Sequence, residues 1–144
     1  MAHPNKRSHS TPPAASATSE LARLAAQTQI EFELAFFSAI LNHHPSYVDV
    51  LRAHAHNLAQ SGQHQESLKV DQRWVQLRPA DPLAHYNLAC SYALTRQVDL
   101  AISTLRHAVT LGYHDFRHMR QDRDLESIRK DPRFRQLLQE YEDQ

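Results

Sequence analysis

A repeat of 34 residues, marked by Pro45 and Pro79, is the feature that most constrains this chain. Apolar residues near these prolines fall into register on the same period. Three columns align: Leu34 with Leu68 and Ile102, Ile40 with Trp74 and Ala108, and Leu41 with Val75 and Val109. A fixed spacing of this length is typical of stacked helical hairpins, in which each hairpin buries its apolar face against its neighbours. Such stacks present a surface to a partner and seldom carry out chemistry.

The composition of the 144 residues predicts an all-α fold class. Glycine occurs only at Gly62 and Gly112, which is too few for the turns of a sheet protein or for a phosphate-binding loop. The residues that dominate the chain, such as Ala, Leu, Gln, Arg and Glu, all favour helices. Antiparallel helical hairpins are therefore expected.

Changes in composition divide the chain into a tail and one domain. Residues 1–18 are rich in Pro, Ser, Thr and Ala and are expected to form a disordered tail. A single domain is expected over residues 19–144. Its expected parts are an N-terminal helix or partial repeat at 19–45, repeats at 46–79 and 80–113, and a C-terminal cap at 114–144.

Short motifs predict where individual helices begin and end. Ser46 and Asp49 have the spacing of a capping box, and Asp81 followed by Pro82 has the form of an N-cap before a proline at the first helical position. Gly62 and Gly112 are suited to end helices, because glycine readily adopts a left-handed backbone conformation.

The repeat resembles the tetratricopeptide repeat family. Small or apolar residues of the family pattern recur between Pro82 and Gly112, at Leu88, Ala89, Tyr92, Ala101, Leu105 and Ala108. The preceding repeat departs from the pattern at His54 and Asp71, where the family has apolar residues. The resemblance implies a short right-handed superhelix with a C-terminal helical cap, acting as a non-catalytic protein-interaction module or scaffold.

The resemblance also implies a concave groove that binds a peptide segment and is lined by the first helix of each repeat. Asn87 can donate and accept hydrogen bonds at once, and Arg52 and His56 can add charge-assisted bonds to an acidic ligand. An ordinary solvated helix face is the alternative for Asn87 and Arg52. The predicted groove residues are Asp49, Arg52, His56, Gln60, Leu83, Tyr86, Asn87, Cys90 and Leu94.

The sequence indicates no catalytic residues, no metal site and no cofactor. Cys90 is expected in the middle of a helix, away from the helix N-terminus that would activate a thiol. His114 and His118 have helical i,i+4 spacing, but a structural zinc site needs four ligands and the chain has one cysteine. We therefore expect a protein that is not an enzyme.

Charge and hydropathy bear on other kinds of partner. The apolar helix at 30–41 would suit a homodimer. The basic segment at 117–135 is the one candidate for binding nucleic acid, although its interspersed acidic residues favour a solvated face. Sixteen basic residues balance sixteen acidic ones, so no net charge attracts nucleic acid. A single cysteine and the lack of a long apolar stretch lead us to expect a cytoplasmic protein without a membrane partner.

Overall fold

The computed structural model describes the backbone of residues 14–142 and the side chains of residues 18–142. Helices form all of the regular structure in this range, with no strand between residues 14 and 142, which confirms the all-α fold class. The elements are α1 (Ala14–His43), α2 (Val48–Gln60), α3 (His64–Leu77), α4 (Pro82–Leu94), α5 (Val98–Thr110), α6 (Phe116–Gln121), the 3-10 helix η1 (Arg123–Ile128) and α7 (Pro132–Glu142).

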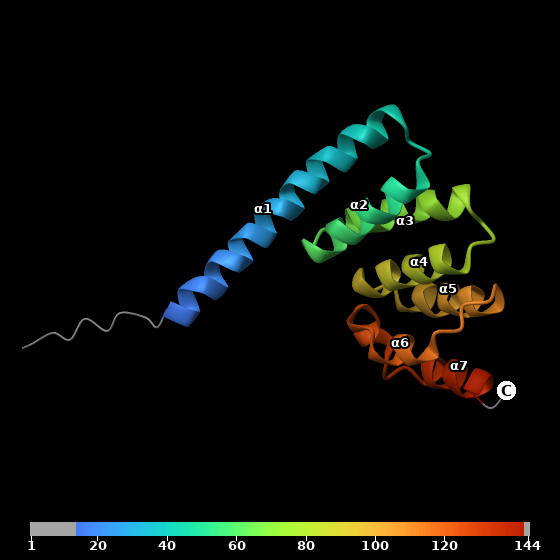
Figure 1. Cartoon of the computed structure of the whole chain (residues 1–144). Coiled ribbons are helices and arrows are strands. Elements are labelled where there is room, and N and C mark those ends of the chain that lie inside the picture. Colours follow the sequence, from blue (N-terminus) through green and yellow to red (C-terminus); the bar gives the residue numbers. More distant parts are fainter. Residues whose placement is uncertain (1–13, 143–144) are drawn as a thin grey trace, which may run out of the picture.

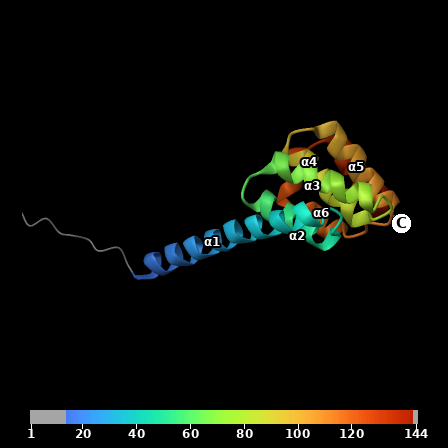
Figure 2. The ribbon, with the colours of Figure 1, turned by 90° about the horizontal axis from the view of Figure 1, so that it is seen from above.

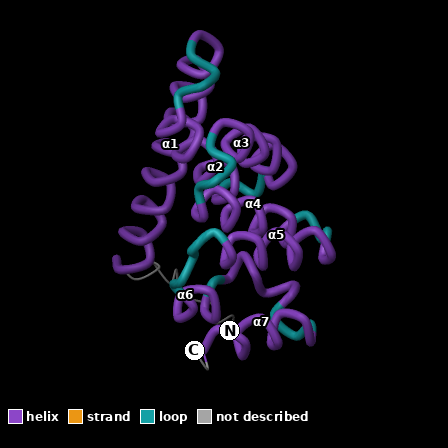
Figure 3. The backbone as a smooth tube through the Cα atoms, turned by 90° about the vertical axis from the view of Figure 1, so that its right-hand side faces the viewer, coloured by secondary structure: helices purple, strands orange, loops and turns teal. Residues whose placement is uncertain are grey.

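The helices stack in pairs along the chain. Figure 1 shows α2 with α3, then α4 with α5, then the C-terminal segment of α6 and α7, arranged one after the other. Helices α3 and α4 join the two hairpins through direct contacts, and α1 packs on α2. The smooth trace in Figure 3 shows the loops as short connections between successive helices.

Two hairpins with the same turn geometry account for the repeat of 34 residues. The N–H of Gln63 donates to the carbonyl of Leu58 at 2.8 Å, and the N–H of Gln97 donates to the carbonyl of Tyr92 at 2.9 Å. These bonds close the helix ends in the Schellman pattern. The pattern requires a left-handed residue, which is Gly62 with a φ of 78° in the first hairpin.

The aligned columns of the sequence form the core. Trp74 and Ala108, which share a column, are both buried, and so are Leu68 and Ile102 in another. The core continues past the last repeat into the C-terminal segment. That segment contributes fully buried apolar side chains at Met119, Leu125, Ile128, Phe134 and Leu137. Residues 114–142 are therefore an integral layer of the fold.

Helix α1 packs on the stack only through its second half. Its half-buried residues begin at Ile30, whereas the side chains of residues 18–29 are exposed. Figures 1 and 2 show the first half extending away from the other helices. The second apolar face of α1 is left open, since Phe32 is 68% exposed and Phe36 is 52% exposed. No helix within residues 14–142 is both long enough and apolar enough to cross a lipid bilayer.

The start of α1 differs from the prediction that the tail extends to residue 18. The helix begins at Ala14, because Ala14, Ala15 and Ala17 favour helical backbone and continue it towards the N-terminus. The remainder of the predicted tail, residues 1–13, lies outside the described residues.

The helix caps confirm one prediction and correct another. The Asp81 carboxylate accepts from the N–H of Leu83 at 2.9 Å, with Pro82 at the first helical position, as predicted. The capping box at Ser46 is wrong, because Tyr47 is the N-cap residue of α2 and its side chain makes no capping bond. Ser46 lies one position too early and contacts Arg73 of α3 at 3.5 Å instead.

Candidate interaction groove

One face of α2 and one residue of α4 form a polar groove. Asp49, Arg52, Ala53 and His56 of α2 line it together with Asn87 of α4, around a volume of about 390 Å³. These α2 residues are three or four positions apart, so they lie on one side of the helix. The side chains of Asp49, Arg52 and His56 are exposed. The groove therefore brings four of the predicted binding residues together.

Arg52 is held in place by an aromatic ring. Its guanidinium carbon lies 5.5 Å from the centroid of the Trp74 ring, which is within the range of a cation–π interaction. Trp74 itself is fully buried in the core. This contact orients the guanidinium group, whose N–H donors point outward in its plane and stay available.

Asn87 is half-buried at the floor of the groove. Within residues 18–142, no side-chain or backbone group forms a hydrogen bond with its amide. An amide in this position can donate to and accept from the backbone of one extended segment. It is the group in the groove best suited to recognise a peptide rather than a particular side chain.

Tyr86 and Cys90 are not in the open groove, contrary to the prediction. They are 3% and 6% exposed, because η1 packs on this face of α4 and His118 of α6 lies against the Tyr86 ring. The Tyr86 hydroxyl donates to the Asp122 carboxylate at 2.6 Å, and its ring stacks on Tyr113 at a centroid distance of 4.0 Å. Burial is the main cause that raises the pKa of Tyr86, and the nearby Cys90 and Asp122 raise it further.

The other three predicted groove residues lie outside the groove. Gln60 is exposed at the end of α2, and Leu83 is half-buried in the first turn of α4. Leu94 lines cavities at the opposite end of α4, together with residues of η1 and of the turn at 62–66. None of these three side chains lines the groove between Asp49 and Asn87.

A second cavity shares His56 and Asn87 with the groove, and the sequence prediction missed it. His56, Asn87 and Cys90 reach its wall from the groove side, and Asp71 and Asp124 line it as well. One Asp71 oxygen accepts from the Ser91 hydroxyl at 2.5 Å, and the other has no partner. Burial raises the pKa of Asp71 to about 7. The signal in the sequence was the departure at position 71, where the repeat pattern has an apolar residue.

The apolar stripe on α1 is a second exposed surface. The rings of Phe32 and Phe36 stack with a centroid distance of 6.0 Å and an angle of 9° between their planes. Leu21 and Leu24 are also exposed on the same helix. This stripe coincides with the helix predicted to form a homodimer interface.

Part of the basic segment at 117–135 is paired within the fold. Arg133 pairs with Asp99 and Asp131 at 2.8 and 2.9 Å, and Arg120 pairs with Glu142. Arg129 donates to the backbone carbonyl of Asp122. Other cations of the same segment are exposed, namely Arg117, Arg123, Lys130 and Arg135. Nucleic-acid binding by this segment therefore stays a prediction.

Comparison with known proteins relates the chain to one curated plant protein and to solved structures of MamA. An 88-residue stretch is 33% identical to a curated chloroplastic protein from Arabidopsis thaliana; this stretch covers 59% of the chain. The chain spans about a quarter of that curated relative, 26% of its length. No family model matches the chain.

Solved structures of MamA resemble the fold. The structure titled MamA 41-end from Desulfovibrio magneticus RS-1 superposes with a TM-score of 0.58 at 23% identity, covering 84% of this chain and 71% of that one. A MamA RS-1 ArsTM double mutant gives a TM-score of 0.56 at 22% identity, covering 84% and 72%. The similarity at this level of identity concerns the arrangement of the helices.

Proposed function

We propose that the chain is a non-catalytic scaffold that binds a peptide segment of a partner protein. The ground is its tetratricopeptide-repeat fold, which is that of protein–protein interaction scaffolds. The proposed site is the groove of Asp49, Arg52, His56 and Asn87. One observation carries the proposal: these polar side chains from two helices converge on a single open groove.

The chemistry of the groove favours an extended segment that carries an acidic group. The Asn87 amide would hold the peptide backbone, because it can pair with one N–H and one carbonyl. Arg52, fixed against Trp74, would bind a carboxylate through two of its donors. Asp49 would favour a basic residue elsewhere on the peptide. Together, Arg52 and Asp49 would then set the direction of the peptide along the groove.

The experiment compares capture of partners by two double variants. Arg52→Ala with Asn87→Ala removes one cation and one amide from the groove. The control, Lys69→Ala with Gln76→Ala, removes the same groups from exposed positions of α3. Partners captured from native lysate and quantified by mass spectrometry should fall at least about tenfold for the groove variant alone, which corresponds to about 1.4 kcal/mol.

Circular dichroism should show equal helicity for both variants. Capture of the same partners at unchanged strength by the groove variant would overturn the proposed site. Equal losses in both variants would overturn it as well, since the effect would then not belong to the groove.

A second candidate function is self-association through α1. The exposed Phe32 and Phe36 support it, because stacked aromatic rings on an open helix face are unusual in a monomer. Analytical ultracentrifugation should then show a dimer for the unaltered chain. The double variant Phe32→Ser with Phe36→Ser should sediment as a monomer. A monomer at every concentration of the unaltered chain removes this candidate.

We propose a reducing compartment, the cytoplasm, as the location. Cys90 is the single cysteine in the chain and is a buried free thiol, which fits such an environment. Fractionation of native cells tests this, and recovery in an oxidising or enclosed compartment would contradict it.

A further inference from the structure

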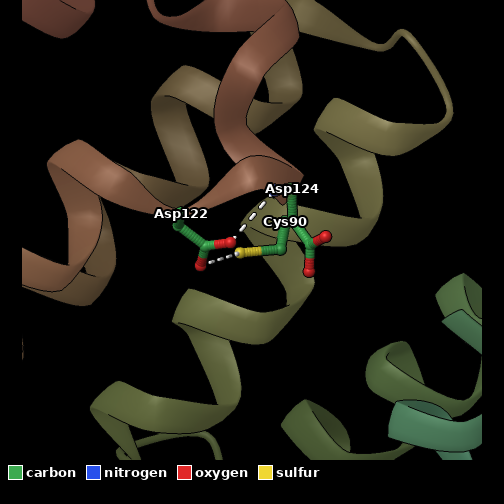
Figure 4. Close-up of side chains that lie close together, drawn as sticks. All are labelled: Cys90, Asp122 and Asp124. Carbon is green, nitrogen blue, oxygen red and sulfur yellow. Dashed lines mark hydrogen bonds between the residues drawn. The ribbon is translucent and has the colours of Figure 1, made fainter. Parts of the chain in front are cut away.

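Three potential metal ligands meet where the C-terminal segment covers α4. Cys90 comes from the middle of α4, Asp122 from the junction of α6 and η1, and Asp124 from η1. Figure 4 shows their side chains close together, with Cys90 and Asp122 directed towards each other. One ligand atom from each residue lies within 4.8 Å of the other two, and the Cys90 sulfur is 3.8 Å from the Asp122 carboxylate.

Neighbouring groups fix the Asp122 carboxylate. One oxygen accepts from the Tyr86 hydroxyl at 2.6 Å, and the other accepts from the N–H of Asp124 at 3.0 Å. Tyr86 is in turn held by stacking on Tyr113. Hydrogen bonds of this kind orient the ligands of metal sites before the ion arrives.

A third carboxylate, outside this cluster, independently points to a cation. Asp71 is 3% exposed and lines the same cavity as Cys90 and Asp124, and one of its oxygens has no hydrogen-bond partner. Such an orphaned buried oxygen is rare and calls for an explanation, such as an ion.

The cluster has little positive charge around it. His56, His64 and His118 are the basic side chains that act on Asp124, and among the described residues only His118 forms a salt bridge with the cluster. Burial raises the pKa of Cys90 and of Asp124, and the neighbouring carboxylates raise both further. Three carboxylates and a thiol without a Lys or Arg partner would be stabilised by a bound cation.

We propose that Cys90, Asp122 and Asp124 bind one divalent transition-metal ion of the zinc class. A thiolate with two carboxylates suits Zn²⁺ better than Ca²⁺ or Mg²⁺, which prefer oxygen ligands alone. The Cys90 thiol releases its proton to solvent as the sulfur–metal bond forms, and water takes the fourth position. Since Cys90 belongs to α4 and the two aspartates to the C-terminal segment, the ion bridges these elements, and its fourth position stays open, unlike that of a closed structural site.

Cobalt provides the direct test, because a cobalt–thiolate bond gives an absorption band in the near ultraviolet. Cys90 is the only cysteine of the chain, so this band can arise from no other residue. Titration of the full chain with Co²⁺ should give a saturable band at one ion per chain, and Zn²⁺ should abolish it. Absence of the band, or coordination by surface histidines only, would overturn the proposal.

Three variants sharpen the test. Asp122→Asn with Asp124→Asn keeps the thiol and should weaken the affinity for Co²⁺ at least about tenfold. Glu126→Gln removes an exposed carboxylate from the same 3-10 helix and should bind as the unaltered chain does. Zn²⁺ should raise the melting temperature of the unaltered chain and of Glu126→Gln but not of Cys90→Ser. Equal Zn²⁺ stabilisation of Cys90→Ser contradicts the site even if the aspartate variant does not fold.

Discussion

Arg96 occupies a backbone conformation that suits glycine. It follows Gly62 by 34 residues and closes the second hairpin as Gly62 closes the first, with a φ of 60°. A left-handed conformation costs a non-glycine residue about 1–2 kcal/mol. The repeat therefore keeps the turn geometry where it has lost the residue that favours it.

Arg96→Gly should increase the free energy of unfolding by about 0.5–1 kcal/mol. Glycine removes the backbone strain, which stabilises the folded chain. Its greater conformational entropy in the unfolded chain destabilises the folded state and offsets about half of that gain. Urea denaturation measures the change. Arg96→Ala is the matched control, because it removes the same side chain and retains the strain. An equal gain in both variants would assign the effect to the side chain.

Asp71 should make stability depend on pH. Its folded-state pKa of about 7 lies above the ordinary value of 3.8, so the folded chain holds a proton that the unfolded chain has released between these values. Stability is therefore fully present below about pH 4, falls as the pH rises towards 7 and levels off above that.

Asp71→Asn should remove this decline, since an amide does not titrate, and the gain at pH 8 should be on the order of a few kcal/mol. Urea denaturation at pH 5 and pH 8, with EDTA present, gives the comparison. If the free energies of unfolding of Asp71→Asn and of the unaltered chain differ by the same amount at both pH values, Asp71 is ionised at both and the prediction is wrong.

At the scale of elements, a polar bond between side chains links the packed half of α1 to the stack. The Asn57 amide of α2 donates to the Glu33 carboxylate of α1 at 2.8 Å, and Asn57 is buried. Hydrogen bonds from Gln29 and Asn57 lower the pKa of Glu33. The half-buried residues of α1 begin at Ile30, so this bond lies in the half of the helix that packs on α2.

Asn57→Ala should lower the free energy of unfolding by about 1 kcal/mol, because a buried bond to a charged acceptor is lost. Gln29→Ala removes only the exposed bond within α1 and should cost less than about 0.5 kcal/mol. Thermal denaturation of both variants measures the difference. Equal effects would mean that the link between the helices contributes nothing.

The sequence predicted the hairpins of the period, the helix before them and a helical cap after them, but not where the cap packs. Hairpins 48–77 and 82–110 followed from aligned apolar columns and from the turns at Gly62 and Asp81, because both signals are local. The place of residues 114–142 was not predictable in this way, since their apolar residues have no partner positions in the repeat. Consequently Tyr86 and Cys90 were assigned to an open face that the C-terminal segment covers.

At the scale of the whole molecule, the C-terminal segment decides which surface remains for a partner. It packs Met119, Leu125 and Ile128 into the core of the second hairpin and closes the inner face of α4. The groove is thereby reduced to α2 and Asn87. The proposed scaffold function and the proposed metal site both require this segment to stay closed over α4 in solution.

Labelling of the Cys90 thiol tests this closed arrangement most directly. With EDTA present, a thiol reagent should modify Cys90 in the native chain at least about a thousandfold more slowly than in the unfolded chain, because access requires global or large-scale opening. Rapid labelling in native buffer, near the rate of the unfolded chain, would show that residues 114–142 do not cover α4 and would contradict the account.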